Sequence, residues 1–495
     1  MIIVLFIAAF IAMIWTYLFR SRFKAPRLRY PPGPVGVSMP THNPWIQYKA
    51  WGKEYGELIY IRDRNSLIVN DLQVATDLLE KRARIYSDRE PSVMVALSGL
   101  GEYNFAFMRY SDTWRIFRKT FLQSFRQAKA SQFHFAERKQ VQKFLQRLIL
   151  EPSDNMRHIM ALSQNLIYDA LYGLDLEPDD DMAQSVAHIV EENLDYIFSP
   201  EISSRLNRYP WLEYLPSWFP GCGFKKIADE CRKELERSSK IPLDLAVNNL
   251  KAGLKTSLIA ELVIQKEGDL GAINGMGVAS ALAGADTTGS SISSFLLAMI
   301  KYPEVQAKAQ AEIDHVVGQD RLPIFEDRES LPYVESVYRE VMRLYPPVPL
   351  GVSHVSIEDD FYRDYYIPKG CAVFANIWAI NRDPSLYSDP DTFRPERFLD
   401  SPKGPFRSIN DITAFGFGRR VCPGRYMAED SVWLAIASVL ATLNVGKAKD
   451  EEGNEIEPSG EYTPGPFFSH PKPYRFATVP RSPRARAFVL AAEQE

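Results

Sequence analysis

The chain has 495 residues, of which 46% are hydrophobic and 24% charged, and its formal net charge is −4. This composition is typical of a globular protein with a sizeable buried core. The small negative charge offers no whole-chain attraction to nucleic acid, so we expect no DNA or RNA partner. The four cysteines lack the paired short spacing of a zinc site and are too sparse for a disulfide framework, which indicates reduced thiols.

The first 19 residues form an almost unbroken apolar run, close to the length of about 20 residues that crosses a bilayer as a helix. Five basic residues follow it between Arg20 and Arg29, which favours a cytosolic position for that flank. A cleavable secretory signal would carry its charge before a shorter apolar core. We therefore predict a transmembrane signal anchor at 1–19, a basic and proline-rich hinge at 20–40 and the body of the protein at 41–495.

The body begins with a small region of β-structure and then becomes mainly helical. Alternating, β-branched residues predict a hairpin over 58–70, which a short helix at 72–81 follows. The stretch 91–108 is apolar without clear periodicity, and we interpret it as a loop beside an apolar site. Helical patterns dominate from about 136 to 264.

A predicted helix at 111–125 places Trp114 and Arg118 on one face. An indole N–H beside a guanidinium group suits a carboxylate or phosphate partner. The alternative is a basic surface helix with a tryptophan in the core, which is the commoner outcome for such a pattern taken alone.

A long apolar helix is predicted from Ala272 to Lys301, and Ala283-Gly284-Ala285-Asp286-Thr287-Thr288 lies in its middle. A glycine in a helix costs about 1 kcal/mol, and a buried acid costs more unless it is paired. We therefore expect the helix to open locally beside a reacting ligand. The alternative, a hydroxyl that bonds to the preceding turn, suits Thr288 better than Asp286 with Thr287.

Three further residues gain interest only in combination. Glu340 and Arg343 are three residues apart on a predicted helix over 331–345, so they share a face and can pair. Arg397 follows in the stretch 393–398 and could join them in a buried network.

His354 stands in a predicted strand over 350–357, with another strand at 371–375, and an isolated histidine is usually structural.

The stretch Phe415 to Gly424 presents Cys422 in a glycine-rich, basic loop. The helix predicted from Tyr426 to Leu440 would bring its positive N-terminus to the sulfur, and Arg420 adds charge, so the loop suits a thiolate. The alternative is an ordinary loop with a buried free cysteine.

The order of these motifs resembles the cytochrome P-450 family of haem-thiolate monooxygenases, and most of all the microsomal members of fungi. The haem-binding pattern FxxGxRxCxG is met by Phe415 to Gly424, and the oxygen-binding pattern AGxDTT by Ala283 to Thr288. The pattern ExxR is met by Glu340 and Arg343, PERF by Pro395 to Phe398, and WxxxR by Trp114 to Arg118.

The resemblance implies a mainly α fold with small β-sheets and a role for each matched residue. Haem b would be the cofactor, with Cys422 as its axial thiolate ligand and Phe415 shielding the sulfur. Asp286 and Thr287 would guide protons toward the haem. The haem propionates would be held by Trp114, Arg118, His354 and Arg420. The scaffold behind the haem would be locked by Glu340, Arg343 and Arg397.

The sequence departs from the family pattern in two places. The segment after the proline hinge, Val35 to Pro40, runs almost directly into Asn43, where an IGN-like stretch is usual. This puts the packing of the hinge on the small sheet in doubt. Ser353 stands where a proline usually precedes the propionate histidine, and there we expect a local loop change without loss of haem.

The resemblance also implies partners and a location. NADPH would supply electrons through a separate reductase, with cytochrome b5 as a second donor, because the chain contains no dinucleotide-binding GxGxxG. The mainly apolar segments 93–108, 277–285, 348–352 and 462–469 would face the haem, which suits a lipophilic molecule such as a terpenoid secondary metabolite. The anchor implies a single-pass protein of the endoplasmic reticulum membrane with a cytosolic catalytic domain. A haem-thiolate isomerase or dehydratase and a haem sensor are the alternatives.

Overall fold

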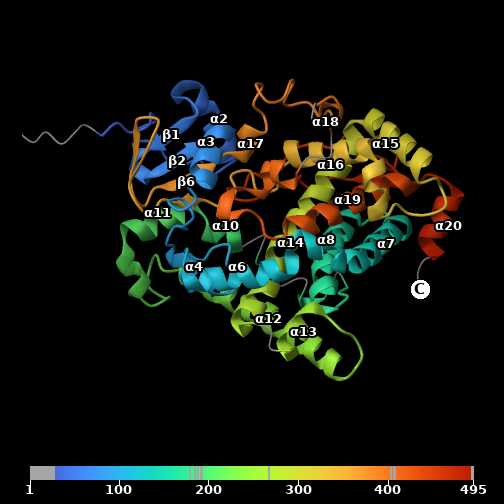
Figure 1. Ribbon diagram of the computed structural model, residues 1–495, viewed down its shortest axis with the longest axis horizontal. Coiled ribbons are helices and arrows are strands. Elements are labelled where there is room, and N and C mark those ends of the chain that lie inside the picture. The colour runs from blue at the N-terminus through green and yellow to red at the C-terminus, as the bar shows by residue number, and fades with distance from the viewer. Residues whose placement is uncertain are drawn as a thin grey trace, which may run out of the picture.

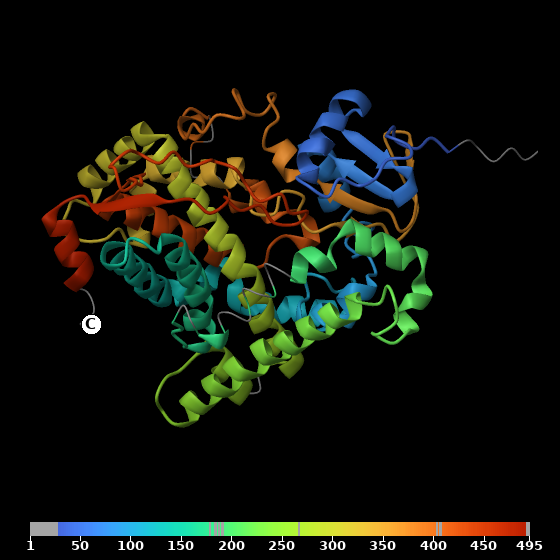
Figure 2. The same ribbon diagram turned by 180° about the vertical axis from the view of Figure 1, so that it is seen from behind.

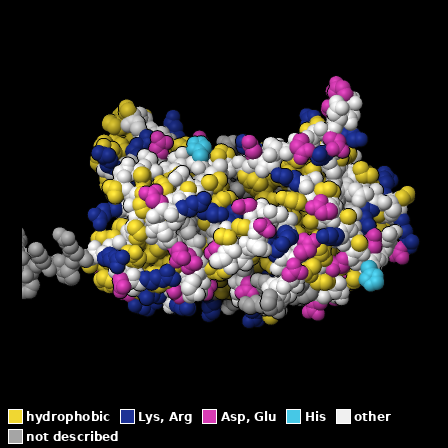
Figure 3. Space-filling model, turned by 90° about the horizontal axis from the view of Figure 1, so that it is seen from above, with side chains coloured by type: hydrophobic (Ala, Val, Ile, Leu, Met, Phe, Trp, Pro, Cys, Tyr) yellow, Lys and Arg dark blue, Asp and Glu magenta, His cyan; other side chains and the backbone are white. Residues whose placement is uncertain are grey.

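The computed structural model describes residues 28–491, apart from 178–179, 183–185, 187–188, 190–192, 266–267, 402–403 and 405–407. Over this part of the chain the fold is mainly helical with three small β-sheets, which confirms the predicted fold class. Its described ends lie at opposite ends of the long axis (Figures 1 and 2). Acidic and basic side chains are interspersed over the face drawn in Figure 3.

A central helix, α14 (Leu270–Lys301), runs through the middle of the molecule and contacts helices from both halves of the chain (Figure 1). The contacting helices are α5 (Leu100–Tyr103), α6 (Asp112–Phe125), α8 (Asn155–Tyr172), α12 (Phe224–Lys251), α13 (Leu258–Gln265), α15 (Pro303–Val316), α16 (Pro332–Leu344) and α19 (Arg425–Thr442). Most of α14 is buried, which explains its largely apolar sequence.

The remaining helices are shorter or peripheral. They are α2 (Pro44–Tyr55), α3 (Leu72–Ala75), α4 (Val93–Leu97), α7 (His134–Leu150), α10 (Leu194–Ile197), α11 (Pro200–Arg208), α17 (Ile377–Ile380), α18 (Glu396–Leu399) and α20 (Pro483–Ala491). The predicted helix at 72–81 is observed as α3 continued by a π-helical turn, η2 (Thr76–Lys81).

A four-stranded sheet lies at the end of the molecule where the described chain begins (Figures 1 and 2). Its strand order is β1 (Leu58–Ile61), β2 (Ser66–Val69), β6 (Ala372–Ala375) and β3 (His354–Val355). The predicted hairpin is β1 paired antiparallel with β2, and β2 pairs parallel with β6. Two-stranded sheets are formed by β4 (Asp360–Tyr362) with β5 (Tyr365–Ile367), and by β7 (Leu443–Lys447) with β8 (Phe476–Pro480).

The described part of the hinge packs on this sheet despite the short segment that follows it. The backbone N–H of Tyr60 in β1 donates to the carbonyl of Pro32 at 2.9 Å, and the rings of Tyr30 and Tyr60 stack with centroids 5.2 Å apart. Gly36 N donates to Asp63 Oδ2 at 2.9 Å. The chain is thereby fixed on the sheet before α2 begins.

Two expectations from the sequence are corrected. The stretch 91–108 is not a plain loop, because it contains α4 and α5; Ser92 caps α4, and the side chains of Met94 and Leu100 are buried. The helix α14 runs without interruption through Asp286 and Thr287, although a local opening was expected.

The predicted signal anchor at 1–19 lies outside the described residues. None of the described helices is both long and apolar enough to cross a membrane.

Candidate active site

The cysteine loop joins a short 3-10 turn, η9 (Gly418–Arg420), to the N-terminus of α19. The backbone N–H of Cys422 donates to the carbonyl of Phe415 at 2.8 Å, which closes the loop. Gly418 has a φ of +58°, and a Cβ added there would lie 2.0 Å from the carbonyl oxygen of Leu79. Only glycine allows the loop to approach η2 this closely.

Two opposing effects act on the pKa of the Cys422 thiol. Burial raises the pKa of Cys422, whereas the N–H of Gly424 and the guanidinium groups of Arg118 and Arg425 lower it. Arg118 donates to the carbonyl of Val421 at 2.6 Å, and Arg425 to the carbonyl of Cys422 at 3.0 Å. The loop therefore holds two cations near a half-buried sulfur, which suits a thiolate that is further stabilised by a metal ion.

The predicted propionate ligands line one cavity together with Cys422 and Phe415. Arg420 donates to the carbonyls of Ser87, Phe105 and Met108, and its guanidinium carbon lies 4.3 Å from the centroid of the Trp114 ring. Burial lowers the pKa of both Arg420 and Arg118 to about 10. The structure thus brings residues from α6 and from the cysteine loop to the same wall.

His354 lines the same cavity at the start of β3. Its Nδ1 lies 2.6 Å from the carbonyl oxygen of Tyr86, and because a carbonyl only accepts hydrogen bonds, Nδ1 carries the proton. Burial, with the charges of Arg89 and Arg420, lowers the pKa of His354 to about 3, so the ring is neutral. The nitrogen Nε2 then carries no proton and cannot donate to a propionate carboxylate, so this state of the ring does not support the role predicted for His354.

Arg89 is a cavity residue that the sequence did not reveal. It is buried, lines the cavity and donates to the carbonyls of Ala106, Val352 and Ser353. The last of these bonds is made to the carbonyl of Ser353, the residue that stands in place of the usual proline. A single arginine between two predicted elements has no periodicity that would have marked it as buried.

These residues fit a flat, dianionic cofactor. The cavity collects three guanidinium groups, from the buried Arg89 and the half-buried Arg118 and Arg420. Trp114 Nε1 is buried and has no hydrogen-bond partner among the described residues. Buried N–H groups and cations of this kind require an anionic acceptor. Haem propionates would provide two carboxylates, and Cys422 lines the same cavity as the candidate iron ligand.

Thr287 faces the cavity, but its hydroxyl is engaged. Its Oγ1 donates to the carbonyl of Ala283 at 2.7 Å. The bond to the preceding turn was expected for Thr288 and instead forms at Thr287. The hydroxyl is thereby satisfied within the helix, and α14 continues through Thr287 without opening.

Asp286 does not line the cavity, although it precedes Thr287 directly. Its side chain is buried, and its Oδ1 lies 3.2 Å from Nε2 of His470. Its other oxygen, Oδ2, is buried with no hydrogen-bond partner among the described residues. The pairing with His470 offsets part of the burial cost that the sequence suggested, and nothing in the sequence linked these two residues.

The rest of the cavity wall is largely apolar. Three of the four predicted segments contribute, with Asn104–Ala106, Ala279–Gly284 and Val348–Val352 supplying lining residues. The fourth segment does not line the cavity; its Phe467 stacks on Phe198 with ring centroids 5.0 Å apart. The sequence missed lining residues from α6 and α8, including Phe121, Phe125, Leu166 and Ile167.

Glu340, Arg343 and Arg397 form the buried network that their spacing suggested. Arg343 donates to both carboxylate oxygens of Glu340, at 2.7 and 2.8 Å, and Arg397 Nε donates to Oε1 at 3.0 Å. Neither Arg343 nor Arg397 lines the cavity, so the network holds α16 to α18 without touching a ligand.

A cysteine ligand that faces a cavity lined with guanidinium groups, under a long helix with a threonine at its centre, defines a haem-thiolate enzyme. Comparison with known proteins agrees. The family model for cytochrome P-450 matches residues 34–477. Cytochrome P-450 monooxygenase 176 of Postia placenta is 36% identical over 97% of this chain and 95% of its own. The tryptamine 4-monooxygenase of Psilocybe cyanescens is 35% identical over 92% of this chain and 94% of its own.

A solved zebra fish cytochrome P-450 in complex with progesterone has the same fold, with a TM-score of 0.71 at 24% identity. It covers 88% of this chain and 99% of its own. The chain therefore belongs to the cytochrome P-450 family and is a haem-thiolate monooxygenase. When bound, the haem activates O2 for oxygen transfer. Cys422 would supply the thiolate ligand, and the guanidinium groups that line the cavity would hold the haem propionates.

Proposed function

We propose that this protein inserts one oxygen atom from O2 into a lipophilic, uncharged small molecule, of the class to which terpenoid secondary metabolites belong. The observation that carries the proposal is the apolar part of the cavity lining that Cys422 shares. It consists of small and apolar side chains around Thr287, among them Phe105, Ala279, Ala283, Val348 and Leu350. Such a wall binds by burial of apolar surface and selects against charged groups.

The cavity lining also bears on the amine substrate that the name of one relative implies. No aspartate or glutamate is found among the described lining residues, whereas three arginines are. A protonated amine such as tryptamine would find no carboxylate side chain there, and the three arginines would be paired with the haem propionates. The proposal therefore favours neutral molecules over cationic ones, in spite of the 35% identity with tryptamine 4-monooxygenase.

Reconstitution with a microsomal reductase tests the proposal. A panel of neutral terpenes, matched with cationic amines of similar size, would be scored for substrate-dependent NADPH consumption and for oxygenated product. We expect both signals with neutral members of the panel. Rearranged product without NADPH consumption would indicate an isomerase or dehydratase, and spectral changes only with amines would contradict the apolar assignment.

We further propose that the reductase docks over a basic hollow beside the cysteine loop. Five basic residues line it: Arg115, Arg118, Lys119, Arg126 and Arg425. Arg118 and Arg425 also hydrogen-bond the backbone of Val421 and Cys422, so this surface lies immediately behind the thiolate. An acidic electron donor bound there would be steered by charge and would reach the iron by a short path. Cytochrome b5 would compete for the same surface.

Charge reversal of Arg126, a residue that does not touch the cysteine loop in the described contacts, tests this docking surface. Arg126→Glu should slow reduction of the haem by reductase and reduce the salt dependence of that step. Lys240→Glu, on the exposed side of α12, is the matched control. Equal reduction rates in both variants would place the docking site elsewhere.

We also propose that the protein is attached to the endoplasmic reticulum membrane by residues 1–19, with its body in the cytosol. A second feature supports contact with lipid. Trp211, Tyr214 and Trp218 are 54%, 82% and 78% exposed, next to α11. α11 lies at the same end of the molecule as the described start of the chain (Figures 1 and 2). Exposed tryptophan and tyrosine side chains suit a membrane interface.

Cell fractionation, together with binding to vesicles, distinguishes the anchor at residues 1–19 from the contact made by the exposed aromatic side chains. Deletion of residues 1–19 should release most of the protein from microsomes but leave weak binding to vesicles. The further substitution of Trp211 and Trp218 by Ser should abolish that residual binding. Full membrane retention without residues 1–19 would contradict the anchor.

A further inference from the structure

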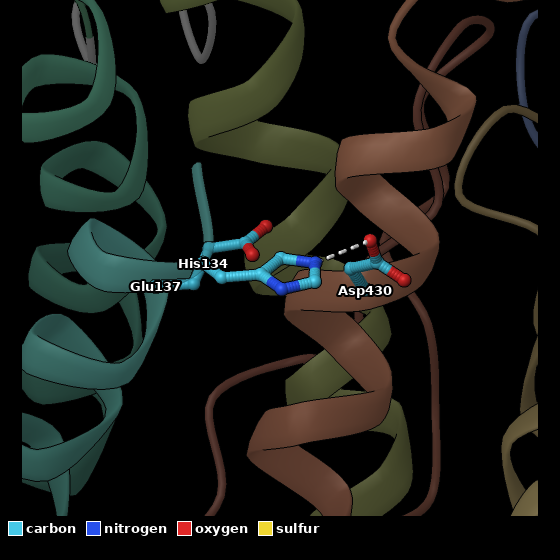
Figure 4. A group of neighbouring side chains, drawn as sticks. All are labelled: His134, Glu137 and Asp430. Carbon is cyan, nitrogen blue, oxygen red and sulfur yellow. Dashed lines mark hydrogen bonds and ion pairs between the residues drawn. The ribbon is translucent and has the colours of Figure 1, made fainter. Parts of the chain in front are cut away.

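A cluster of potential metal ligands lies outside the haem cavity, between α7 and α19. His134 is the first residue of α7, and Glu137 follows one turn later on the same face. Asp430 is on α19, the helix that begins after the cysteine loop. Figure 4 shows the His134 ring and the Glu137 carboxylate extending from α7 toward Asp430.

The spacing of the ligand atoms suits a small cation. Nε2 of His134 lies 3.2 Å from Oδ2 of Asp430, and the ligand atoms of all three residues lie within 4.8 Å of one another. Zinc binds nitrogen and carboxylate oxygen at about 2.0 to 2.2 Å, so two ligands at a tetrahedral angle are roughly 3.3 Å apart. Small side-chain rotations of Glu137 would complete three sides of a tetrahedron.

The side chain of Glu137 independently indicates a ligand at this cluster. The residue is fully buried, and its Oε1 accepts a hydrogen bond from Ser431 at 2.7 Å. Its Oε2 is buried and has no hydrogen-bond partner among the described residues. An oxygen in this position requires either a proton or a cation.

The charges around the cluster favour a divalent cation. Asp430 Oδ1 is bonded by Arg328, which also bonds Glu335 and Glu429. Arg339 is the second guanidinium group of this network and bonds Glu335 at 2.8 Å. Glu137 also lies in the field of the Arg138 guanidinium group, so four carboxylates face three guanidinium groups, which leaves an excess of one carboxylate. Because Arg328 approaches Oδ1, Oδ2 is left to face His134.

We propose that His134, Glu137 and Asp430 bind one divalent transition-metal ion, for which Zn²⁺ is the best match to one imidazole and two carboxylates. The ion replaces the hydrogen bond between His134 and Asp430 and gives Glu137 Oε2 a partner, with water as a fourth ligand. The ring of His134 is already held by stacking on Phe325, with centroids 3.6 Å apart. The bound ion ties α7 to α19 and therefore braces the helix that follows Cys422.

Zinc titration of the haem-loaded enzyme, after treatment with chelator and desalting, tests the proposal by calorimetry. We expect one saturable zinc site, with affinity lowered by at least about tenfold in His134→Ala and Asp430→Asn, because loss of a ligand costs more than loss of its support. His315→Ala, which removes an exposed histidine on α15, is the matched control and should bind zinc normally.

A stability measurement uses the isosteric variant Glu137→Gln, which keeps the shape of the side chain. Zinc should raise the thermal midpoint of the unsubstituted enzyme and leave that of Glu137→Gln unchanged. Absence of a saturable zinc site in the unsubstituted enzyme would overturn the proposal and assign a proton to Glu137. Equal zinc affinity in His134→Ala would overturn it as well, since the ion would then bind elsewhere.

Discussion

Nε2 of His470 lies 3.2 Å from Oδ1 of Asp286, and this pair joins the segment after Phe468 to the middle of α14. The same segment is held at the neighbouring residue, where Ser290 Oγ donates to the carbonyl of Ser469 at 2.9 Å. The carboxylate is buried, and the histidine side chain is 28% exposed. The half-buried imidazole therefore links the buried carboxylate of Asp286 to the more exposed part of this segment.

Replacement of His470 should destabilise the protein, because Asp286 loses its partner. His470→Ala leaves a buried carboxylate without its partner, and we expect the free energy of unfolding to fall by about 1–3 kcal/mol. His470→Gln keeps an N–H donor and should lose less. Urea denaturation measures both, and Asp286→Asn combined with His470→Ala should be less destabilised than the sum of the single variants. Strict additivity would show that the two side chains do not interact.

How far the sequence predicted the site depends on the range of each interaction. The motif around Cys422 and the spacing of Glu340 with Arg343 are local patterns, and the structure places both as expected. His470 and Arg89 depend on contacts between segments far apart in the chain, and no local pattern identifies such partners. The hydroxyl bond of Thr287 was missed because two adjacent threonines offer the same chemistry and only packing selects between them.

The close approach of the cysteine loop to η2 gives a prediction for Gly418. A Cβ at this position would lie 2.0 Å from the Leu79 carbonyl oxygen, and the φ of +58° is unfavourable for other residues. Gly418→Ala should therefore displace the loop and lower haem content, measured by the carbon monoxide difference spectrum. Gly446→Ala is the control, because a Cβ there meets nothing within 4 Å. Normal haem content in Gly418→Ala would contradict the steric argument.

The buried network of Glu340 and the exposed pair of Lys308 with Glu396 should contribute very different amounts to the free energy of unfolding. Glu340 is fully buried and accepts bonds from Arg343 and Arg397, so Glu340→Gln leaves two buried cations short of charge. We expect a loss of about 3–5 kcal/mol in the free energy of unfolding.

The nearby pair of Lys308 with Glu396 is the control. Its lysine side chain is 57% exposed, so Lys308→Ala should cost no more than about 1 kcal/mol. Denaturant titration of both variants measures the difference. A cost for Glu340→Gln no larger than that for Lys308→Ala would show that the buried network is not needed for the scaffold.

Arg232 on α12 connects that helix to the segment that carries part of the cavity wall. Its guanidinium group donates to the carbonyls of Ala96 and Leu97 and to both carboxylate oxygens of Glu102, at 2.9 to 3.1 Å. The pKa of Arg232 is raised by its hydrogen bond with Glu102. This contact closes α4 and α5 against α12, immediately before the lining residues Asn104 and Phe105.

Loss of this contact should therefore affect access to the cavity more than stability. Arg232 and Glu102 are 30% and 62% exposed, so Arg232→Ala should cost only about 1 kcal/mol in the free energy of unfolding. We expect the rate constants for substrate binding and release, followed by stopped-flow absorbance of the haem, to rise several-fold. Lys233→Ala removes the neighbouring exposed pair with Asp229 and should leave both rates unchanged. Unaltered rates in Arg232→Ala would mean that substrate reaches the cavity by a route that does not separate α4 and α5 from α12.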